Sequence, residues 1–372
     1  MKIAMIGHKH IPSREGGVEV VVEELSKRMV QQGHQVTCYN RRTDHTNGKD
    51  FNGKWEKKYM GIQLKSVYAI PKRGLAAVSS SILASILSSF SDADIIHFHA
   101  EGPAFLCWFP KLFSKKVVVT IHGLDHQRAK WGKFASFYIL TGEKNAVRFA
   151  DEIIVLSKEV QKYFKEKYNR DTIFIPNGVN KPEILPPKII KEKYDLDKDS
   201  YILYLGRLVP EKGIHYLIEA FKDIKTDKKL VIAGGSSDTD SYFRKLREMS
   251  KDDSRILFTG FVQGELLEEL YSNAYIYCLP SNLEGMPLSL LEAMSYGNCC
   301  LVSDISECTE VVEDKAEIFQ KGNLGDLKEK LNELIFSSEK VRKLKKSSSK
   351  FVCNKYNWEK VVESTLKIYG SK

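Results

Sequence analysis

The sequence predicts an α/β protein with two doubly wound domains, each a parallel sheet covered by helices on both faces. The chain has 372 residues, which is enough for two domains of ordinary size. Short apolar runs alternate with longer amphipathic segments along nearly its whole length, as is typical of consecutive strand–helix units. With 42% hydrophobic and 28% charged residues, the composition excludes collagen-like, low-complexity and wholly disordered chains.

The first series of elements opens with an apolar run at residues 2–6, which predicts a strand, followed by helical spacing over 18–32. Further short apolar runs in this half predict strands at 35–39, 94–98, 117–121, 152–156 and 173–175. The pattern weakens in a segment that holds Pro182, Pro186 and Pro187, which indicates an interdomain linker. We therefore assign the first domain to residues 1–180.

The second series begins with a predicted strand at 201–205 and continues with strands at 229–233, 255–259, 275–279 and 299–302. The spacing of apolar residues predicts helices between them, among them 265–273 and 288–296. We assign the second domain to residues 181–356, and a last helical pattern occupies 358–369. Ligands of doubly wound sheets bind beyond the carboxyl ends of the strands, so the residues that follow each strand are the binding candidates.

Positive charge is concentrated in the first half of the chain. The chain has 57 Lys and Arg residues against 48 Asp and Glu residues, a net charge of +9, and residues 1–180 hold 27 basic and 17 acidic residues, a net +10. This asymmetry favours an anionic partner such as nucleic acid, a membrane surface or a phosphorylated substrate. No basic helix with interleaved aromatic residues is found, so we expect no nucleic acid partner.

The cysteines and the N-terminal segment indicate the cytoplasm. The seven cysteines are odd in number and show no C-x-x-C spacing, which favours neither a zinc ribbon nor a disulfide framework. No apolar signal region and no run of about 18 apolar residues is present. We expect a cytoplasmic protein, and the basic first half leaves open a peripheral contact with the inner face of the plasma membrane.

Gly16 and Gly17 follow the first predicted strand and open the helix at 18–32. Glycines let the backbone approach a ligand closely, and the free N–H groups at a helix start attract phosphate. A tight turn is an equal alternative. The segment is not a G-x-G-x-x-G fingerprint, and the chain has no Walker A sequence.

Arg207 and Lys212 follow the first strand of the second domain, in a segment that runs from Gly206 to Gly213. A guanidinium and an ammonium beside a helix start suit a diphosphate, because the first binds two oxygens at once and the second acts as a point charge. The alternative is that Glu211 and Lys212 are surface residues that face solvent.

Two carboxylates flank the start of the helix predicted at 288–296. Glu284 precedes the helix, Pro287 suits its first turn, and Glu292 lies about 7 Å along its axis. Carboxylates accept hydrogen bonds from vicinal hydroxyls, so a ribose and a hexose are natural partners. Complementing the helix dipole is an alternative that explains Glu284 but not Glu292.

These residues together resemble the retaining GT-B nucleotide-sugar glycosyltransferases of family 4. The resemblance spans nearly the whole chain, and the opening 7–19 and the segment from His122 to Trp131 are similar to the subgroup of rhamnosyltransferases in bacterial polysaccharide assembly. The motifs that carry it are Gly-Gly-Val-Glu at 16–19, Pro-Asn-Gly-Val at 176–179, Gly-Arg-Leu at 206–208, Glu-Lys-Gly at 211–213, and the pair Glu284 and Glu292.

The resemblance implies roles for individual residues. Arg207, Lys212, Glu284 and His122 are implied as catalytic, with His122 beside the reacting sugar. The remaining implied donor contacts are Gly16, Gly17, Phe261, Val262, Gly285, Met286, Pro287, Leu288 and Glu292, where Glu292 binds the ribose and Phe261 and Val262 flank the base. The acceptor-side candidates are His10, Glu19, Asp125, Arg128 and Lys130. The resemblance also implies that the C-terminal helix at 357–372 returns to the first domain.

We expect no metal and no other cofactor in catalysis. The D-x-D pairs at 92–94 and 238–240 are of the kind that hold Mg²⁺ or Mn²⁺, but the first opens a strand and so lies at the wrong end of the sheet, and Arg207 and Lys212 already supply positive charge. Several histidines, including His126, show no metal-ligand spacing and no carboxylate patterned with them. We expect His97 and His99 to face opposite sides of their strand.

The segment 75–90 contains no charge and has apolar residues at helical spacing. A helix of this kind can rest on a membrane surface, but its polar residues are serines rather than lysines, so we favour a helix buried in the core.

The sequence thus predicts a retaining transferase that moves a hexose or 6-deoxyhexose, rhamnose among them, from a nucleoside diphosphate to a hydroxyl of a glycan. A polyprenyl-linked acceptor in cell-surface polysaccharide biosynthesis is the expected context. Two alternatives stay open: a nucleotide-sugar 2-epimerase of the same fold, and a non-catalytic module that binds sugar nucleotides.

Overall fold

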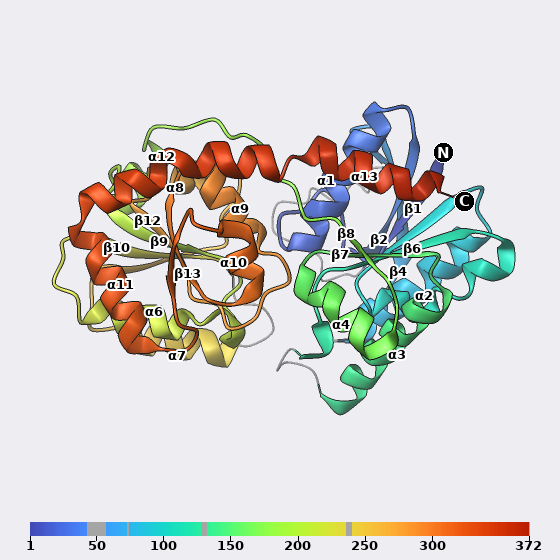
Figure 1. Ribbon diagram of the computed structural model, residues 1–372, viewed down its shortest axis with the longest axis horizontal. Helices are drawn as coiled ribbons and strands as arrows, with labels where there is room; N and C mark the ends of the chain where they lie inside the picture. The colour runs from blue at the N-terminus through green and yellow to red at the C-terminus, as the bar shows by residue number, and fades with distance from the viewer. Residues whose placement is uncertain (43–56, 73, 128–131, 236–239, 372) are drawn as a thin grey trace. The chain divides into compact units, whose positions relative to one another are not determined.

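The computed structural model describes residues 1–42, 57–72, 74–127, 132–235 and 240–371. The chain divides into two compact units, Met1–Asn177 with Trp358–Lys372, and Gly178–Asn357. Each is an α/β unit with a mainly parallel sheet between two layers of helices, which is the predicted fold class (Figure 1). The division falls between Asn177 and Gly178, whereas the sequence places the boundary after residue 180.

The sheet of the N-terminal unit has, within the described residues, eight strands in the order β3-β4-β2-β1-β5-β6-β7-β8. Of these described strands, only β3 is antiparallel to its neighbour. The strands are β1 (Lys2–Ile6), β2 (Gln35–Arg42), β3 (Lys58–Tyr59), β4 (Ile62–Tyr68), β5 (Ile95–His99), β6 (Lys116–Ile121), β7 (Glu152–Val155) and β8 (Ile173–Phe174). Strand β1 pairs with β2 on one side and with β5 on the other, so the chain reverses its direction of winding between β1 and β5.

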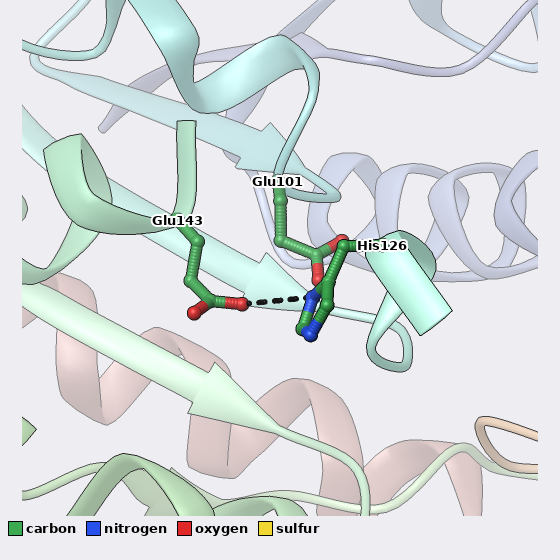
Figure 2. A group of neighbouring side chains, drawn as sticks. All are labelled: Glu101, His126 and Glu143. Atoms are coloured by element: carbon green, nitrogen blue, oxygen red, sulfur yellow. Dashed lines mark ion pairs between the residues drawn. The ribbon is translucent and has the colours of Figure 1, made fainter. Parts of the chain in front are cut away.

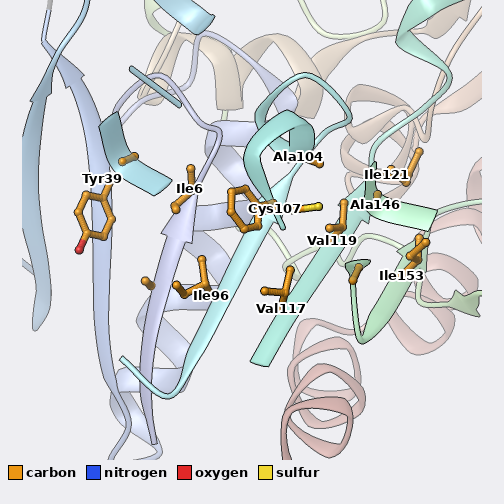
Figure 3. Close-up of a cluster of buried hydrophobic side chains, with 14 of the residues drawn as sticks. Ile6, Tyr39, Ile96, Ala104, Cys107, Val117, Val119, Ile121, Ala146 and Ile153 are labelled. Carbon is orange, nitrogen blue, oxygen red and sulfur yellow. The ribbon is translucent and has the colours of Figure 1, made fainter. Parts of the chain in front are cut away.

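Helices cover both faces of this sheet (Figure 1). α1 (Gly17–Gln31) and α13 (Trp358–Gly370) lie on one face, and α2 (Leu75–Ser89), α3 (Lys133–Phe149) and α4 (Lys158–Tyr168) lie on the other. The core under α2 and α3 is built from alternate residues of the central strands, such as Ile6, Ile96 and Val119, which pack with Ala146 of α3 (Figure 3). This alternation follows from the two-residue period of a strand.

His97 and His99 lie on the same face of β5, and their ring centroids are 4.2 Å apart. The expectation that they face opposite sides is therefore wrong. Residues i and i+2 of a strand always point to one face, and here it is the face of α13, where the hydroxyl of Tyr369 lies 2.6 Å from His97 Nδ1.

Helix α2 turns its small residues inward. Five of its six serines and Ala84 are the buried residues, whereas the side chains of Leu75 and Leu87, and of Phe90 just after the helix, are exposed. Serine hydroxyls are satisfied within the helix, for example Ser85 Oγ donates to the Ser81 carbonyl at 2.7 Å, so they can be buried at little cost. The helix contributes to the core as we expected, but through the serine face and not through its apolar stripe.

The sheet of the C-terminal unit has, among the described residues, six parallel strands in the order β11-β10-β9-β12-β13-β14. They are β9 (Tyr201–Leu205), β10 (Lys229–Ala233), β11 (Ile256–Gly260), β12 (Ile276–Leu279), β13 (Cys299–Ser303) and β14 (Glu317–Phe319). Here the winding reverses between β9 and β12.

The helices of this unit also form two layers (Figure 1). α6 (Ile214–Lys222), α7 (Asp240–Ser250) and α11 (Leu324–Phe336) lie on one face, and α8 (Glu265–Asn273), α9 (Leu288–Ser295) and α12 (Ser338–Lys355) lie on the other. The shorter α5 (Ile189–Tyr194) and α10 (Ser306–Val312) complete the unit. Across the described ranges of the chain, no helix combines the length and apolarity that a membrane span requires.

Candidate functional site

The two loops at the reversal point of the C-terminal sheet pack directly on each other. Gly213 has φ +67°, and a Cβ there would lie 2.0 Å from the carbonyl oxygen of Pro280, so only glycine fits. The backbone N–H of Asn282 also donates to the Glu211 carbonyl at 2.8 Å. The segment after β9 and the segment after β12 are therefore held side by side at the carboxyl edge of the sheet.

This contact joins two of the predicted site residues. The Lys212 ammonium donates to both carboxylate oxygens of Glu284, at 2.5 and 2.6 Å, and Ser281 Oγ donates to Glu284 Oε1 at 2.6 Å. The side chains of Lys212 and Glu284 are only 15% and 6% exposed. Lys212 thus turns to Glu284 and not to solvent, which argues against the surface alternative. Ser281 is a residue that the sequence did not single out.

Arg207 lies on the same edge, two residues beyond the end of β9. Its carbonyl accepts a hydrogen bond from the Tyr204 hydroxyl at 3.0 Å, and its side chain is half-buried. The preceding Gly206 is packed against the next loop, because a Cβ on Gly234 would lie 1.8 Å from the Gly206 carbonyl oxygen. The backbone that presents Arg207 is fixed by close contacts with two neighbours.

Helix α9 begins at Leu288, as predicted, and Pro287 is its N-cap. Gly285 and Met286 are buried just before it. Glu292 lies on the second turn of α9, and its Oε2 accepts a hydrogen bond from the Tyr271 hydroxyl at 3.1 Å.

The two residues implied for the base follow β11. Phe261 is half exposed, and Val262 is buried. A Cβ on Gly235, in the loop after β10, would lie 3.8 Å from the Phe261 side chain. Phe261 therefore borders the loop after β10, the strand that pairs with β9.

In the N-terminal unit, the loop after β1 is fastened by polar contacts. Glu19 Oε1 accepts a hydrogen bond from the Lys9 backbone N–H at 2.8 Å, and Asn40 Oδ1 accepts one from His8 Nε2 at 2.9 Å. A Cβ on Gly16, the N-cap of α1, would meet Glu19 Oε2 at 2.4 Å. Gly17 is exposed at the first position of α1, but Glu19, an acceptor-side candidate, is buried and holds the loop.

His122 follows β6, and its Nε2 lies 3.0 Å from Nδ1 of His99. Burial is the main cause that lowers the pKa of His99 well below its ordinary value, so the neutral form of this ring faces His122. The sequence missed His99 as a partner of His122 because β5 and β6 are neighbours only in the folded sheet.

The other acceptor-side candidates lie at two places in this unit. His10 is half-buried, and burial lowers its pKa. Asp125 opens a 3₁₀ helix, Asp125–Gln127, and its backbone N–H donates to Glu101 Oε1 at 3.1 Å. Arg128 and Lys130 lie outside the described residues.

The acidic pairs considered for a metal are not at the candidate edge. Asp92 pairs with Lys2 at 2.7 Å, and Asp94 accepts from the Lys2 backbone, so both lie at the amino end of β1 and β5. Of the second pair, Asp238 lies outside the described residues. Within the described ranges, the side chains that could hold a metal ion are Glu101, His126 and Glu143, which lie close together in the N-terminal unit (Figure 2).

Comparison with known proteins identifies the class. The family model described as "Glycosyl transferases group 1" matches residues 187–351, and the one described as "Glycosyltransferase Family 4" matches residues 15–181. Together they cover most of both units. The chain belongs to the group 1, family 4 glycosyltransferases, and it is a transferase enzyme.

Individual relatives agree with this class. "Uncharacterized glycosyltransferase MJ1178" of Methanocaldococcus jannaschii is 27% identical over 363 residues, 95% of this chain and 94% of that protein. The N,N'-diacetylbacillosaminyl-diphospho-undecaprenol alpha-1,3-N-acetylgalactosaminyltransferase of Campylobacter jejuni is 27% identical over 277 residues, 65% of this chain and 72% of that protein.

Two solved structures share the GT-B fold. The sucrose-phosphate synthase of Thermosynechococcus elongatus has a TM-score of 0.83 at 22% identity and covers 99% of this chain and 98% of that chain. Anabaena Alr3699/HepE, in complex with UDP and glucose, has a TM-score of 0.82 at 15% identity, with coverage of 99% and 98%.

Proposed function

We propose that this transferase moves a hexose or 6-deoxyhexose, with retention of configuration, from a nucleoside diphosphate to a hydroxyl of a glycan or lipid-linked glycan in cell-surface polysaccharide assembly. Rhamnose is one of the candidate sugars. The observation that carries the proposal is the Lys212–Glu284 pair, which lies with Arg207 at the reversal point of the C-terminal sheet. Doubly wound sheets bind nucleotides at this point.

The proposed donor contacts follow from charge and geometry. A diphosphate needs cations, and Arg207 and Lys212 are presented by one short segment after β9. A sugar needs acceptors for its hydroxyls, and Glu284 lies beside Lys212. We expect donor binding to exchange part of the Lys212–Glu284 contact, so that the ammonium meets a phosphate oxygen and the carboxylate meets a sugar hydroxyl.

The proposed reaction is a same-face substitution. The bond between the anomeric carbon and the phosphate oxygen breaks, a bond to the acceptor oxygen forms, and the acceptor proton passes to the departing phosphate oxygen. Negative charge grows on the diphosphate as the bond breaks, so Arg207 and Lys212 stabilise the transition state more than the bound donor. His122 is proposed to lie beside the reacting sugar.

The comparisons support the coarse donor and acceptor classes. Anabaena Alr3699/HepE binds UDP and glucose, and the C. jejuni relative is named for a diphospho-undecaprenol acceptor. We propose donors and acceptors of these chemical classes for this chain.

A panel of UDP-, GDP- and dTDP-sugars, incubated with lipid-linked glycans, tests the proposal through release of nucleoside diphosphate. We expect one donor to be consumed only when an acceptor is present. Interconversion of the donor sugar without transfer would instead indicate the 2-epimerase, and binding without consumption would indicate a non-catalytic module. Lys212→Ala should lower turnover at least a hundredfold, whereas the exposed control Lys222→Ala on α6 should not change it.

We also propose a peripheral membrane contact through an apolar patch on the N-terminal unit. Phe90 and Leu112 are 67% and 68% exposed, and Leu87 and Phe113 are partly exposed beside them. The Phe90 and Phe113 ring centroids are 4.6 Å apart. Exposed aromatic and aliphatic side chains on a unit with excess positive charge suit an anionic bilayer surface.

Sedimentation with anionic vesicles tests this contact. The double variant Phe90→Ser with Leu112→Ser should bind at least tenfold more weakly than the parent chain, and added salt should weaken binding of the parent. Phe336→Ser, a change of an equally exposed aromatic residue in the C-terminal unit, is the control. Equal binding by all three proteins would refute the contact.

A further inference from the structure

Three ligand-type side chains from separate elements converge in the N-terminal unit. Glu101 follows β5, His126 lies in the 3₁₀ helix after β6, and Glu143 lies on α3 (Figure 2). One ligand atom of each, an imidazole nitrogen and two carboxylate oxygens, lies within 4.8 Å of the other two. Both glutamates are fully buried, and His126 is half-buried at the edge of the group.

The backbone forces these side chains together. A Cβ on Gly142 would lie 1.9 Å from the Glu101 carbonyl oxygen, so α3 packs on the Glu101 backbone through a glycine next to Glu143. The backbone N–H of Asp125 donates to Glu101 Oε1 at 3.1 Å, which holds the 3₁₀ helix and His126 against the same loop. The group is therefore built into the packing and does not depend on exposed, freely rotating side chains.

The two oxygens of Glu143 have different surroundings. Oε1 accepts from the hydroxyls of Tyr163 and Tyr168 at 2.9 and 2.5 Å and from the Lys167 ammonium at 3.1 Å. Oε2 points to the group instead, 3.3 Å from His126 Nδ1 (Figure 2). Protein donors therefore satisfy Oε1, whereas Oε2 is left to face the group.

The atoms that face one another lack hydrogen bonds. Among the described residues, Glu101 Oε2, His126 Nδ1 and Glu143 Oε2 are buried atoms without a hydrogen-bond partner. Buried polar atoms without partners are costly, and a second buried negative charge beside Glu143 is more so. A cation at the centre of the group removes both costs.

We propose that Glu101, His126 and Glu143 bind one divalent transition-metal ion of the Zn²⁺ type through Glu101 Oε2, His126 Nδ1 and Glu143 Oε2. One imidazole nitrogen and two carboxylate oxygens suit such an ion, and water completes the coordination. Ligand atoms at about 2.1 Å from a tetrahedral ion lie about 3.4 Å apart. The His126–Glu143 distance of 3.3 Å already meets this requirement. All three ligand atoms lie within 4.8 Å of one another, so no separation has to close by more than about 1.4 Å.

The ion has a structural role in this proposal. It ties the loop after β5 and the 3₁₀ helix Asp125–Gln127 to α3, but it lies in the unit that does not contain Arg207 and Lys212. The proposal is independent of the proposed transfer reaction. It also leaves standing the expectation that catalysis needs no metal.

Metal analysis of the purified full chain tests the proposal. After loading with Zn²⁺ and passage over a chelating resin, we expect one zinc per chain by mass spectrometry, and at least a tenfold loss of affinity in Glu101→Gln and in His126→Gln. Glu166→Gln, on the exposed side of α4, is the control and should keep the ion. Circular dichroism checks that each variant folds.

A second measurement needs no variant. In the Mn²⁺-loaded parent chain, electron spin echo spectra should show nitrogen modulation from one imidazole. Absence of stoichiometric metal, absence of this modulation, or retention of the ion by Glu101→Gln or His126→Gln would each overturn the proposal and leave a buried water as the occupant.

Discussion

The buried His97 should make the N-terminal unit less stable in acid. Burial, with a smaller contribution from the charge of His122, lowers the pKa of His97 from 6.5 to about 3. In the fold, Nδ1 lies 2.6 Å from the Tyr369 hydroxyl and Nε2 lies 2.7 Å from Thr120 Oγ1, with the His99 ring alongside. The unfolded chain frees the ring to bind a proton that the folded chain excludes.

The sign and size follow from this difference. Between pH 6.5 and about 3 the unfolded state binds more protons than the folded state, so the stabilising contribution is fully present above pH 6.5 and is lost as the pH falls. Each pH unit below 6.5 lowers the free energy of unfolding by about 1.36 kcal/mol. At pH 5.0, protonation of His97 in the unfolded chain therefore lowers it by about 2 kcal/mol.

Urea unfolding followed by tryptophan fluorescence measures this loss. All four tryptophans lie in the residue ranges of the N-terminal unit, so the signal reports the unit that contains His97. We compare the loss between pH 7.5 and pH 5.0 in the parent chain and in His97→Gln, which keeps a polar side chain but does not titrate. The parent should lose about 2 kcal/mol more than the variant. Other buried histidines contribute to both proteins and cancel.

Tyr369→Phe is the matched control. It removes the hydroxyl from the same contact and so destabilises the folded unit, but the imidazole stays buried and still titrates. Its loss between the two pH values should equal that of the parent chain. If His97→Gln loses as much stability on acidification as the parent, then burial does not suppress protonation of His97 and the reasoning fails.

Three further predictions concern the candidate sites. Gly213→Ala should lower turnover at least tenfold, because the added Cβ has no room beside the loop after β12. The control Gly322→Ala, at a similar φ of +71° but in open space, should leave turnover unchanged. Equal rates in the two variants would contradict the packing argument. A double-mutant cycle of Lys212→Met and Glu284→Gln tests the ion pair by urea unfolding followed by circular dichroism. The coupling energy should exceed about 1 kcal/mol, because each single change leaves a mostly buried polar partner. Additive losses of the free energy of unfolding in the double variant would refute the pair. EDTA should leave turnover by the Glu101→Gln variant unchanged, and a loss that Mn²⁺ restores would show that catalysis needs a metal.

The sequence predicts most elements of the fold because strands and helices are governed by local spacing. The strands at 2–6, 201–205 and 229–233 and the helix at 265–273 have the predicted bounds. The strands β3 and β4 were missed, because β4 lies near the sheet edge and several of its residues are polar and exposed, which erases the apolar signal.

The inward face of α2 was misjudged for a different physical reason. Apolar spacing predicts which side of a helix can be buried, but a serine that bonds to its own helix can be buried as well and brings the helix nearer to the sheet. The larger side chains of Leu87 and Phe90 are then left exposed at the surface.

Contacts between residues far apart in the sequence limit how much of the candidate sites can be predicted from the sequence. Glu284 and Lys212 are each recognisable from their own motifs, but their ion pair depends on the position of β9 beside β12. His126 was discounted because the histidines show no metal-ligand spacing and no carboxylate patterned with them, whereas the fold brings two glutamates to His126 from other elements. Spacing along the chain cannot predict such groups, because they follow from strand order.

Glycine links these cases. In both units a glycine packs against the backbone carbonyl oxygen of a residue just after a strand. Gly213 packs on Pro280, and Gly142 packs on Glu101. A charged residue stands directly beside each of these glycines, Lys212 before the first and Glu143 after the second, and is thereby brought to its partner. In these two cases a glycine beside a charged residue marks the position where the backbone of another segment approaches. The strand order must be known before that segment can be identified. Substituting such a glycine should therefore impair the neighbouring charged group even though the charge itself is untouched.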